Sequence, residues 1–94
     1  MTKGNELGIQ GELAAMADLV SRGFLVYRAL SGNQHPDLVA VDTRGRARTV
    51  EVRVITRVNR GNWKRRKKTD QCHHYAWVSR DLSSIEYEPK INAA

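Results

Sequence analysis

The sequence has little cysteine and no long apolar run. One of its 94 residues is cysteine, Cys72, which excludes an internal disulfide. The first residues, Met1-Thr2-Lys3-Gly4-Asn5, include no apolar stretch typical of a signal peptide. No uninterrupted apolar run approaches the roughly 18 residues that a membrane span requires. We therefore expect a cytoplasmic protein that has no membrane partner.

Acidic residues are almost absent from one part of the chain. Between Thr43 and Lys68 there are eleven Lys and Arg residues and one acid, Glu51, so the net charge of +6 is concentrated there. Phosphates that are neutralised by protein release condensed counterions, so such a region is typical of a protein with a polyanion partner. We expect a nucleic acid partner, although a charged face that only prevents aggregation has a similar composition.

The length and the hydrophobic pattern predict one α/β domain over residues 1–94. Apolar residues recur at helical spacing over 6–21, and Gly23 follows, which predicts an amphipathic helix. Strand-forming residues predict strands at 24–30, 37–42, 47–55, 75–79 and 85–88. Residues 57–63 are expected to form a loop, and residues 65–73 a short helix or helical turn. The order α-β-β-β-α-β-β predicts a mixed sheet flanked by helices.

Two carboxylates lie on strands that are expected to pair. Pro36-Asp37 is followed, fourteen residues after the aspartate, by Glu51-Val52-Arg53. Side chains alternate across a strand, so Glu51 and Arg53 share one face while the intervening valines face the core. If Asp37 lies opposite Glu51, the loop is Thr43-Arg44-Gly45, with glycine where three-residue hairpins favour it.

Opposed residues of this kind can share a metal ion. Their Cβ atoms are about 4.5 to 5.5 Å apart, so both carboxylates can reach one hard cation. The spacing therefore predicts a metal site at Asp37 and Glu51. A solvated hairpin face has the same pattern, and a bulge that shifts the register by one residue would separate the two carboxylates.

The first helix supplies a third carboxylate. At about 100° per residue, Glu12 lies inside the apolar arc of the helix, among Ile9, Ala15, Met16 and Leu19. A carboxylate that faces the core needs a partner, so Glu12 is a candidate ligand of the same metal. The alternative is an acid in the first turns, where the helix dipole favours negative charge.

These motifs resemble those of the PD-(D/E)XK nuclease superfamily over roughly residues 8 to 79. Gly11-Glu12, followed by Gly23-Phe24, resembles the first helix of the superfamily, and 35–40 resembles its PD strand. Residues 50–54 resemble the EXK strand, with Arg53 at the lysine position. Further matches are to the Holliday-junction resolvase branch at Arg28 and Ser31-Gly32, and to a Q-x-x-x-Y spacing at Gln71 and Tyr75.

The resemblance implies a restriction-endonuclease-like αβββαβ core that hydrolyses DNA phosphodiester bonds with Mg2+, or with Mn2+ as a substitute. It implies no small-molecule cofactor. The metal ligands would be Glu12, Asp37, Glu51 and the backbone carbonyl of Val52. The same three carboxylates, together with Arg53, would be the catalytic residues.

Arg53 departs from the superfamily pattern. In relatives a lysine at this position orients or activates the attacking water, but a guanidinium keeps its proton and cannot act as a base. In one hypothesis the metal activates water and Arg53 stabilises the transition state. In the other, the site is catalytically silent and only DNA binding remains. The three remaining carboxylates favour the active endonuclease, and a basic RNA-binding protein is a third alternative.

The basic region contains most of the residues expected to contact nucleic acid. Basic side chains there are expected to bind phosphates, and Trp63 is expected to stack on bases or sugars. Gln71 either contacts the substrate backbone or caps a helix. The full set is Arg44, Arg46, Arg57, Arg60, Trp63, Lys64, Arg65, Arg66, Lys67, Lys68 and Gln71.

The remaining expectations concern the core, zinc and assembly. Tyr75 and Trp77 share a strand face and are expected in the core. His73-His74 beside Cys72 is a poor tetrahedral zinc set. Because cleaving two DNA strands takes two active sites, a homodimer is expected. A branched junction, a specific duplex site, a homing site and a damaged end all suit such a scaffold as substrate.

Overall fold

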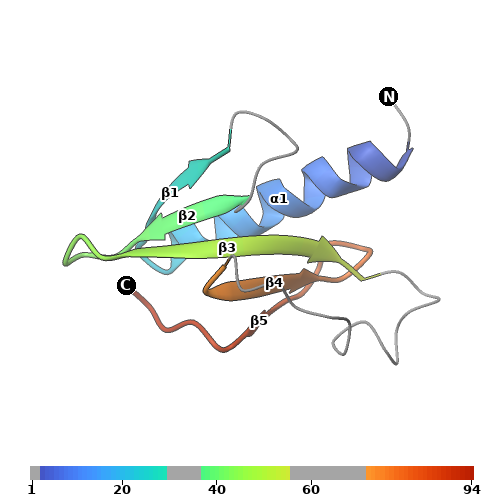
Figure 1. Ribbon diagram of the computed structural model, residues 1–94. Coiled ribbons are helices and arrows are strands. Elements are labelled where there is room, and N and C mark those ends of the chain that lie inside the picture. The colour runs from blue at the N-terminus through green and yellow to red at the C-terminus, as the bar shows by residue number, and fades with distance from the viewer. Residues whose placement is uncertain (1–2, 30–36, 56–71) are drawn as a thin grey trace.

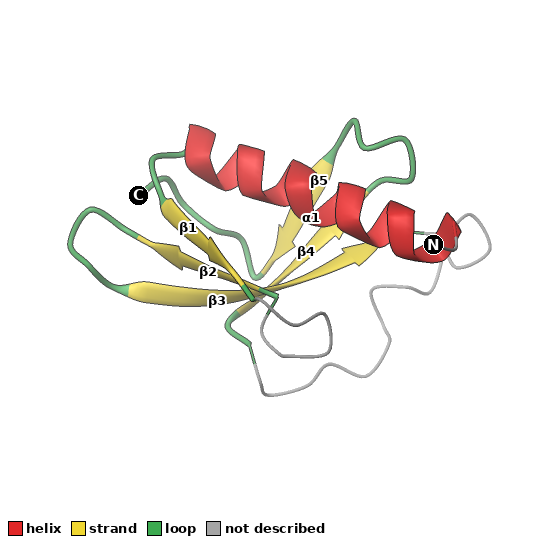
Figure 2. Cartoon of the chain, turned by 90° about the horizontal axis from the view of Figure 1, so that it is seen from above, coloured by secondary structure: helices red, strands yellow, loops and turns green. Residues whose placement is uncertain are grey.

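The computed structural model describes residues 3–29, 37–55 and 72–94. Within these residues helix α1 (Lys3–Ser21) packs on one face of a five-stranded sheet (Figures 1 and 2). The spatial order of the strands is β1 (Leu25–Arg28), β2 (Leu38–Val41), β3 (Ala47–Val54), β4 (His74–Val78) and β5 (Ile85–Glu88). β3 and β4 are parallel, and the other neighbouring pairs are antiparallel. The predicted α/β fold with a mixed sheet is confirmed.

The predicted elements differ from the observed ones mainly at their ends. β1 ends at Arg28, and β4 begins at His74, one residue before the predicted start. Residues 72 and 73 are not helical, so the predicted end of a helix over 65–73 is wrong. The rest of that segment, the loop predicted at 57–63 and the segment 31–36 lie outside the described residues. The connection from β3 to β4 therefore runs through residues whose structure is not described.

α1 ends at Ser21, as predicted, and Gly23 follows in a capping motif. The N–H of Phe24 donates to the carbonyl of Leu19, and the N–H of Gly23 donates to that of Val20. These two bonds, with a φ of 98° at Gly23, form a Schellman motif. Phe24, which is buried, is thereby directed back onto the core beside α1.

The hairpin of β2 and β3 has the predicted register. Leu38 pairs with Val50, and the other pairs follow in step along both strands. This register corresponds to Asp37 opposite Glu51, and the paired residues 38–41 and 47–50 contain no bulge. The regular antiparallel pairing of β2 and β3 therefore sets how Asp37 and Glu51 are placed relative to each other.

The turn of this hairpin is held by Asp42. Its Oδ1 accepts hydrogen bonds from the backbone N–H groups of Arg44 and Arg46, both at 2.9 Å. Gly45 has a φ of 82°, as expected for the glycine of a three-residue loop. The tip projects beyond the rest of the sheet in Figure 1.

The two faces of the sheet bury different residues. The main core lies between the sheet and α1 and includes Leu19, Leu38, Val50 and Val78. Tyr75 and Trp77, buried as predicted, form a second cluster with Ile55 and Cys72. Their rings stack with centroids 5.3 Å apart. No helix in the described part of the chain is long and apolar enough to cross a membrane.

The segment after β5 returns to the end of α1. The Tyr87 hydroxyl donates to Asp18 Oδ2 at 2.8 Å, and Arg22 Nε donates to the same oxygen at 2.9 Å. Arg22 Nη1 also donates to the carbonyl of Ile91, a buried residue of the main core. This network joins the helix to the last residues of the chain.

Candidate active site

Helix α1 comes unusually close to β3 at Gly11. This glycine is buried, and a Cβ on it would lie 2.5 Å from Val54 Cγ2 and 3.8 Å from Val52 Cγ1. Real Cβ contacts are not that short, so the glycine permits the approach. The next residue is Glu12, which is therefore carried by a helical turn pressed against the strand of the predicted EXK motif.

Asp37 lies just before β2, where the paired ladder with β3 has ended. Its Oδ2 accepts a hydrogen bond from the backbone N–H of Val52 at 2.9 Å. The carboxylate thus lies against the backbone of β3. Simple strand alternation instead predicts that it points toward one face of the sheet. This difference arises because Asp37 caps the end of the strand pair.

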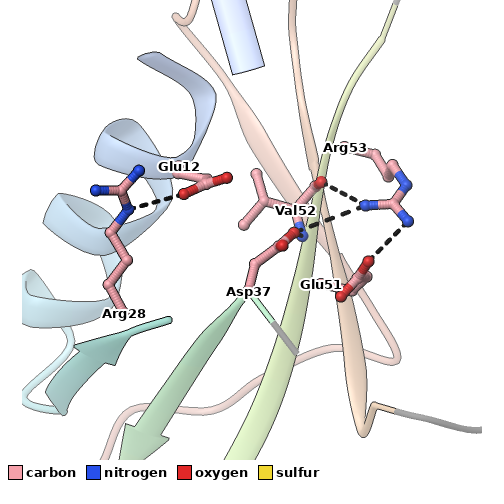
Figure 3. A network of polar contacts seen from close by, with 6 residues as sticks. All are labelled: Glu12, Arg28, Asp37, Glu51, Val52 and Arg53. Carbon is pink, nitrogen blue, oxygen red and sulfur yellow. Dashed lines mark hydrogen bonds and ion pairs between the residues drawn. The ribbon is translucent and has the colours of Figure 1, made fainter. Parts of the chain in front are cut away.

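Glu51, Val52 and Arg53 supply the other polar groups of the site. Arg53 Nη2 lies 2.7 Å from Glu51 Oε2, and Arg53 Nη1 donates to the carbonyl oxygen of Val52 at 2.9 Å. The same Nη1 lies 3.6 Å from Asp37 Oδ2. One guanidinium therefore contacts all three oxygen donors that these strands were predicted to contribute to a metal site (Figure 3).

Exposure differs sharply within this group. The side chain of Glu51 is 2% exposed and that of Asp37 is 14% exposed, whereas that of Arg53 is 44% exposed. The carboxylates are therefore held by the fold, while the guanidinium reaches them from the solvent side.

Asp37 lies between two groups of charges. In Figure 3 it is drawn between the pair Glu12–Arg28 and the pair Glu51–Arg53. Burial raises the pKa of the Asp37 carboxyl above its ordinary value, and the negative charges of Glu51 and Glu12 raise it further. The Val52 N–H and the charge of Arg53 act in the opposite direction. Accumulated negative charge of this kind favours a bound cation.

Glu12 has a partner of its own. Arg28 Nε lies 2.9 Å from Glu12 Oε1, and the Glu12 side chain is 23% exposed. In the part of the chain that is described, no three Asp, Glu, His or Cys side chains are close enough together to hold a metal ion. The role of Glu12, Asp37 and Glu51 as one ligand set therefore stays a prediction.

The donor chemistry at the strand pair nevertheless fits a hard cation. Asp37, Glu51 and the Val52 carbonyl present only oxygen atoms, which Mg2+ and Mn2+ prefer. They already surround one positive charge, that of Arg53. A metal at this place would be held by residues that the fold has brought together.

The predicted nucleic acid contacts are described only at the hairpin tip. Arg44 is exposed there, and Arg46 is 65% exposed while its Nε lies 3.1 Å from Asp42 Oδ2. The remaining predicted contacts fall outside the described residues; they are Arg57, Arg60, Trp63, Lys64, Arg65, Arg66, Lys67, Lys68 and Gln71. All of these contacts stay predictions.

The adjacent histidines use their rings in separate structural contacts. His73 Nδ1 accepts a hydrogen bond from the backbone N–H of Thr49 at 3.0 Å. His74 is buried, and its Nδ1 lies 2.8 Å from the carbonyl oxygen of Pro89. The two rings therefore contact different elements of the fold.

Three residues of this region have roles that the sequence did not indicate. Gly11 permits the close approach of α1, Arg28 pairs with Glu12, and Asp42 caps the hairpin turn. Only Asp42 has a local signal, because an aspartate directly before a turn often accepts hydrogen bonds from the turn backbone. The other two contacts join segments distant in the sequence.

The sequence matches no protein-family model, and it is not significantly similar to any curated protein. The structure is similar to that of the bacterial homing endonuclease I-Ssp6803I, with a TM-score of 0.73 and 16% sequence identity. The match covers 92% of this chain and 68% of the endonuclease chain. At this identity the similarity shows a shared fold. The predicted α/β fold is thus shared with this endonuclease, while membership of the PD-(D/E)XK superfamily and of its Holliday-junction resolvase branch stays a prediction.

Proposed function

We propose that this protein is a metal-dependent DNA endonuclease whose active site lies at the ends of β2 and β3. The observation that carries the proposal is the convergence of Asp37, Glu51 and the Val52 carbonyl on one positive charge. The similarity of the fold to a homing endonuclease supports the same reaction class. A fold alone does not determine activity, so the argument rests on the site.

Each residue of the site has a defined task in this reaction. Bound Mg2+ supplies a Lewis acid that neutralises charge on the phosphate and activates water. Asp37, Glu51 and the Val52 carbonyl would hold the metal on the strand pair, and Glu12 of α1 would be a further ligand. Arg53 binds a nonbridging oxygen of the scissile phosphate and stabilises its developing charge, since its guanidinium cannot accept a proton.

The basic residues bind the DNA backbone, and those that the structure describes lie at the tip of the β2–β3 hairpin. Arg44 and Arg46 present two guanidinium groups at the tip of the β2–β3 hairpin, and β3 leads from that tip to Glu51. At about 3.3 Å per residue, the seven residues from Arg44 to Glu51 span on the order of 20 Å. Because phosphate contacts position DNA without reading its sequence, these residues set the placement of the duplex.

A duplex with a specific sequence is the first substrate class to test, because a homing endonuclease shares the fold. Branched junctions and damaged ends are the alternatives. A homodimer would supply one active site to each strand. Sedimentation of the protein with and without duplex DNA tests the dimer, and a monomer in both conditions would contradict it.

Metal-dependent cleavage of DNA tests the proposal directly. Supercoiled plasmid, duplex oligonucleotides and four-way junctions are incubated with the protein in Mg2+, in Mn2+ or in EDTA. Cleavage is expected only with metal, and Asp37→Asn and Glu51→Gln are each expected to lower it by at least about 100-fold. Glu6→Gln, an exposed carboxylate at the start of α1, is the matched control. Equal cleavage by the parent, Asp37→Asn and Glu51→Gln would contradict the proposed site.

A catalytically silent DNA-binding protein is the second candidate. The observation that favours it is the 2.7 Å ion pair between Arg53 and Glu51, which neutralises the charge of a buried carboxylate without any metal. In this case the parent binds DNA but cleaves no substrate in either metal. Arg53→Lys places the superfamily lysine at this position. Cleavage gained by this variant identifies Arg53 as the residue that silences the site, whereas no gain means that the site lacks other groups needed for cleavage.

A further inference from the structure

The Arg53 guanidinium lies against the oxygen atoms that would hold a divalent metal ion. Its guanidinium lies 2.7 Å from Glu51 Oε2, 2.9 Å from the Val52 carbonyl oxygen and 3.6 Å from Asp37 Oδ2 (Figure 3). These are the oxygen atoms through which β2 and β3 would hold the metal. A guanidinium and a divalent cation both need these lone pairs, and two positive charges repel each other at such short distances.

Of the groups in this cluster, Arg53 is the one that is able to leave. Glu51 and Asp37 are 2% and 14% exposed, and Asp37 is also bound to the Val52 N–H. The Arg53 side chain is 44% exposed, and its contacts with the site oxygens are all made by the guanidinium at its end. Rotation about its side-chain bonds moves the guanidinium into solvent without disturbing the strand.

We infer that Arg53 is a built-in competitor of the metal, which exchanges its carboxylate partners for the DNA phosphate when metal and DNA bind together. This inference rests on the proposed function. Before binding, the guanidinium neutralises the buried carboxylates and lowers their affinity for a free cation. After binding, the metal neutralises them, and the released guanidinium contacts a phosphate oxygen.

Such an exchange couples the two ligands. DNA supplies a new partner for Arg53 and so removes the competitor from the metal site, which raises metal affinity. By linkage, the metal must raise DNA affinity by the same factor. The protein would thus bind its metal mainly on DNA, where the reaction takes place. A metal site without a competing guanidinium would not have this dependence.

Mn2+ binding to the full chain without DNA tests the competition. Free Mn2+ is counted by electron paramagnetic resonance in titrations of the parent, Arg53→Gln and Asp37→Asn. Arg53→Gln is expected to bind Mn2+ about tenfold more tightly than the parent, within the usual range for coupled sites. Arg80→Gln, which removes an exposed positive charge in the turn between β4 and β5, is the control and is expected to match the parent.

Binding of DNA provides the second readout. The affinity for a labelled duplex is measured by fluorescence anisotropy in EDTA and in Ca2+, with cleavage monitored on the same samples. Ca2+ is expected to strengthen DNA binding by the parent, and to strengthen it several-fold less in Arg53→Gln. Arg53→Lys serves if Arg53→Gln does not fold, because a lysine keeps the charge but cannot contact two oxygens in a fork.

The outcomes separate this inference from the proposed function. Suppose that Mn2+ binds the parent and that Asp37→Asn lowers the affinity for Mn2+. If Arg53→Gln then has the same affinity as the parent or a lower one, the competition is refuted and the metal site stands. If neither the parent nor Arg53→Gln binds Mn2+, with or without uncleaved DNA, the metal site and the inference both fail. Tighter binding in Arg53→Gln with unchanged binding in Arg80→Gln supports the exchange.

Discussion

Gly11 and Val54 lie so close together that a Cβ on the glycine would be 2.5 Å from Val54 Cγ2. This contact sets the distance between α1 and the strand that carries Glu51 and Arg53. We expect Gly11→Ala to reduce the free energy of unfolding by about 1 to 3 kcal/mol, because overpacking outweighs the higher helix propensity of alanine. Chemical denaturation followed by circular dichroism measures this loss.

Gly8 provides a matched control in the same helix. A Cβ there would meet no atom within 4 Å. Gly8→Ala is therefore expected to stabilise the protein by up to about 1 kcal/mol through helix propensity alone. Val54→Ala is expected to recover part of the stability lost in Gly11→Ala. Loss of stability in both glycine variants alike would show that the close contact is not its cause.

Arg53 is expected to be needed for cleavage, independently of its effect on metal affinity. Removing one hydrogen-bond donor to a developing oxyanion typically lowers kcat by about 100- to 1,000-fold. We expect a guanidinium that stabilises charge on the phosphate to contribute a similar factor. Arg53→Ala should therefore lower kcat by at least about 100-fold at saturating Mg2+, whereas Arg53→Lys keeps a positive charge and should lower it less. Single-turnover cleavage measures both, and full activity in Arg53→Ala would exclude a role for Arg53 in the reaction.

The Tyr87 hydroxyl joins the last strand to α1 through Asp18. The bond is 2.8 Å long, and Asp18 is shared with Arg22. Tyr87→Phe is expected to lower the free energy of unfolding by about 1 kcal/mol, the usual net value of one hydrogen bond. Tyr27→Phe makes the same chemical change at an exposed position of β1, where we expect a change within about 0.5 kcal/mol. Equal losses in both variants would contradict a specific contribution of the Asp18 contact.

Local sequence signals were sufficient to predict the strands and the hairpin register. Gly45 stands where a three-residue loop favours a positive φ, and the alternation along 49–54 indicates which face carries the valines of the main core. Gly23 likewise ends α1 through a capping motif that involves only neighbouring residues. Each of these features depends on residues that are close together in the sequence.

The arrangement of the site depends on contacts that local patterns do not contain. Arg28 was recognised only as part of a motif, yet it pairs with Glu12 across the space between β1 and α1. Arg53 was expected to face a phosphate or water, and in the structure it contacts Glu51 instead. The tertiary fold and the ligands present decide which partner a long charged side chain contacts. The spacing of residues in the sequence therefore identified the candidate site residues but not which of them pair with each other.

His74 is expected to make stability depend on pH between about pH 7 and pH 5. Burial lowers the pKa of its imidazole below the ordinary value, and the nearby charge of Arg48 lowers it further, although the bond to the Pro89 carbonyl acts in the opposite direction. The unfolded chain, whose histidine has a pKa of about 6.5, then binds a proton that the folded protein does not. The stability that neutral His74 contributes is therefore fully present above about pH 6.5 and is lost as the pH falls below that value.

The variant His74→Gln isolates this contribution from the carboxylates that also titrate in acid. At pH 7.5 it is expected to be less stable than the parent by about 1 kcal/mol, because the imidazole contacts with Pro89 and Arg48 are lost. At pH 5 the difference should be smaller, since the parent has by then lost part of the stability that the neutral ring supplied. Urea denaturation of both proteins at several pH values measures the difference. A difference that stays constant from pH 7.5 to pH 5 would mean that His74 takes up no proton on unfolding in this range.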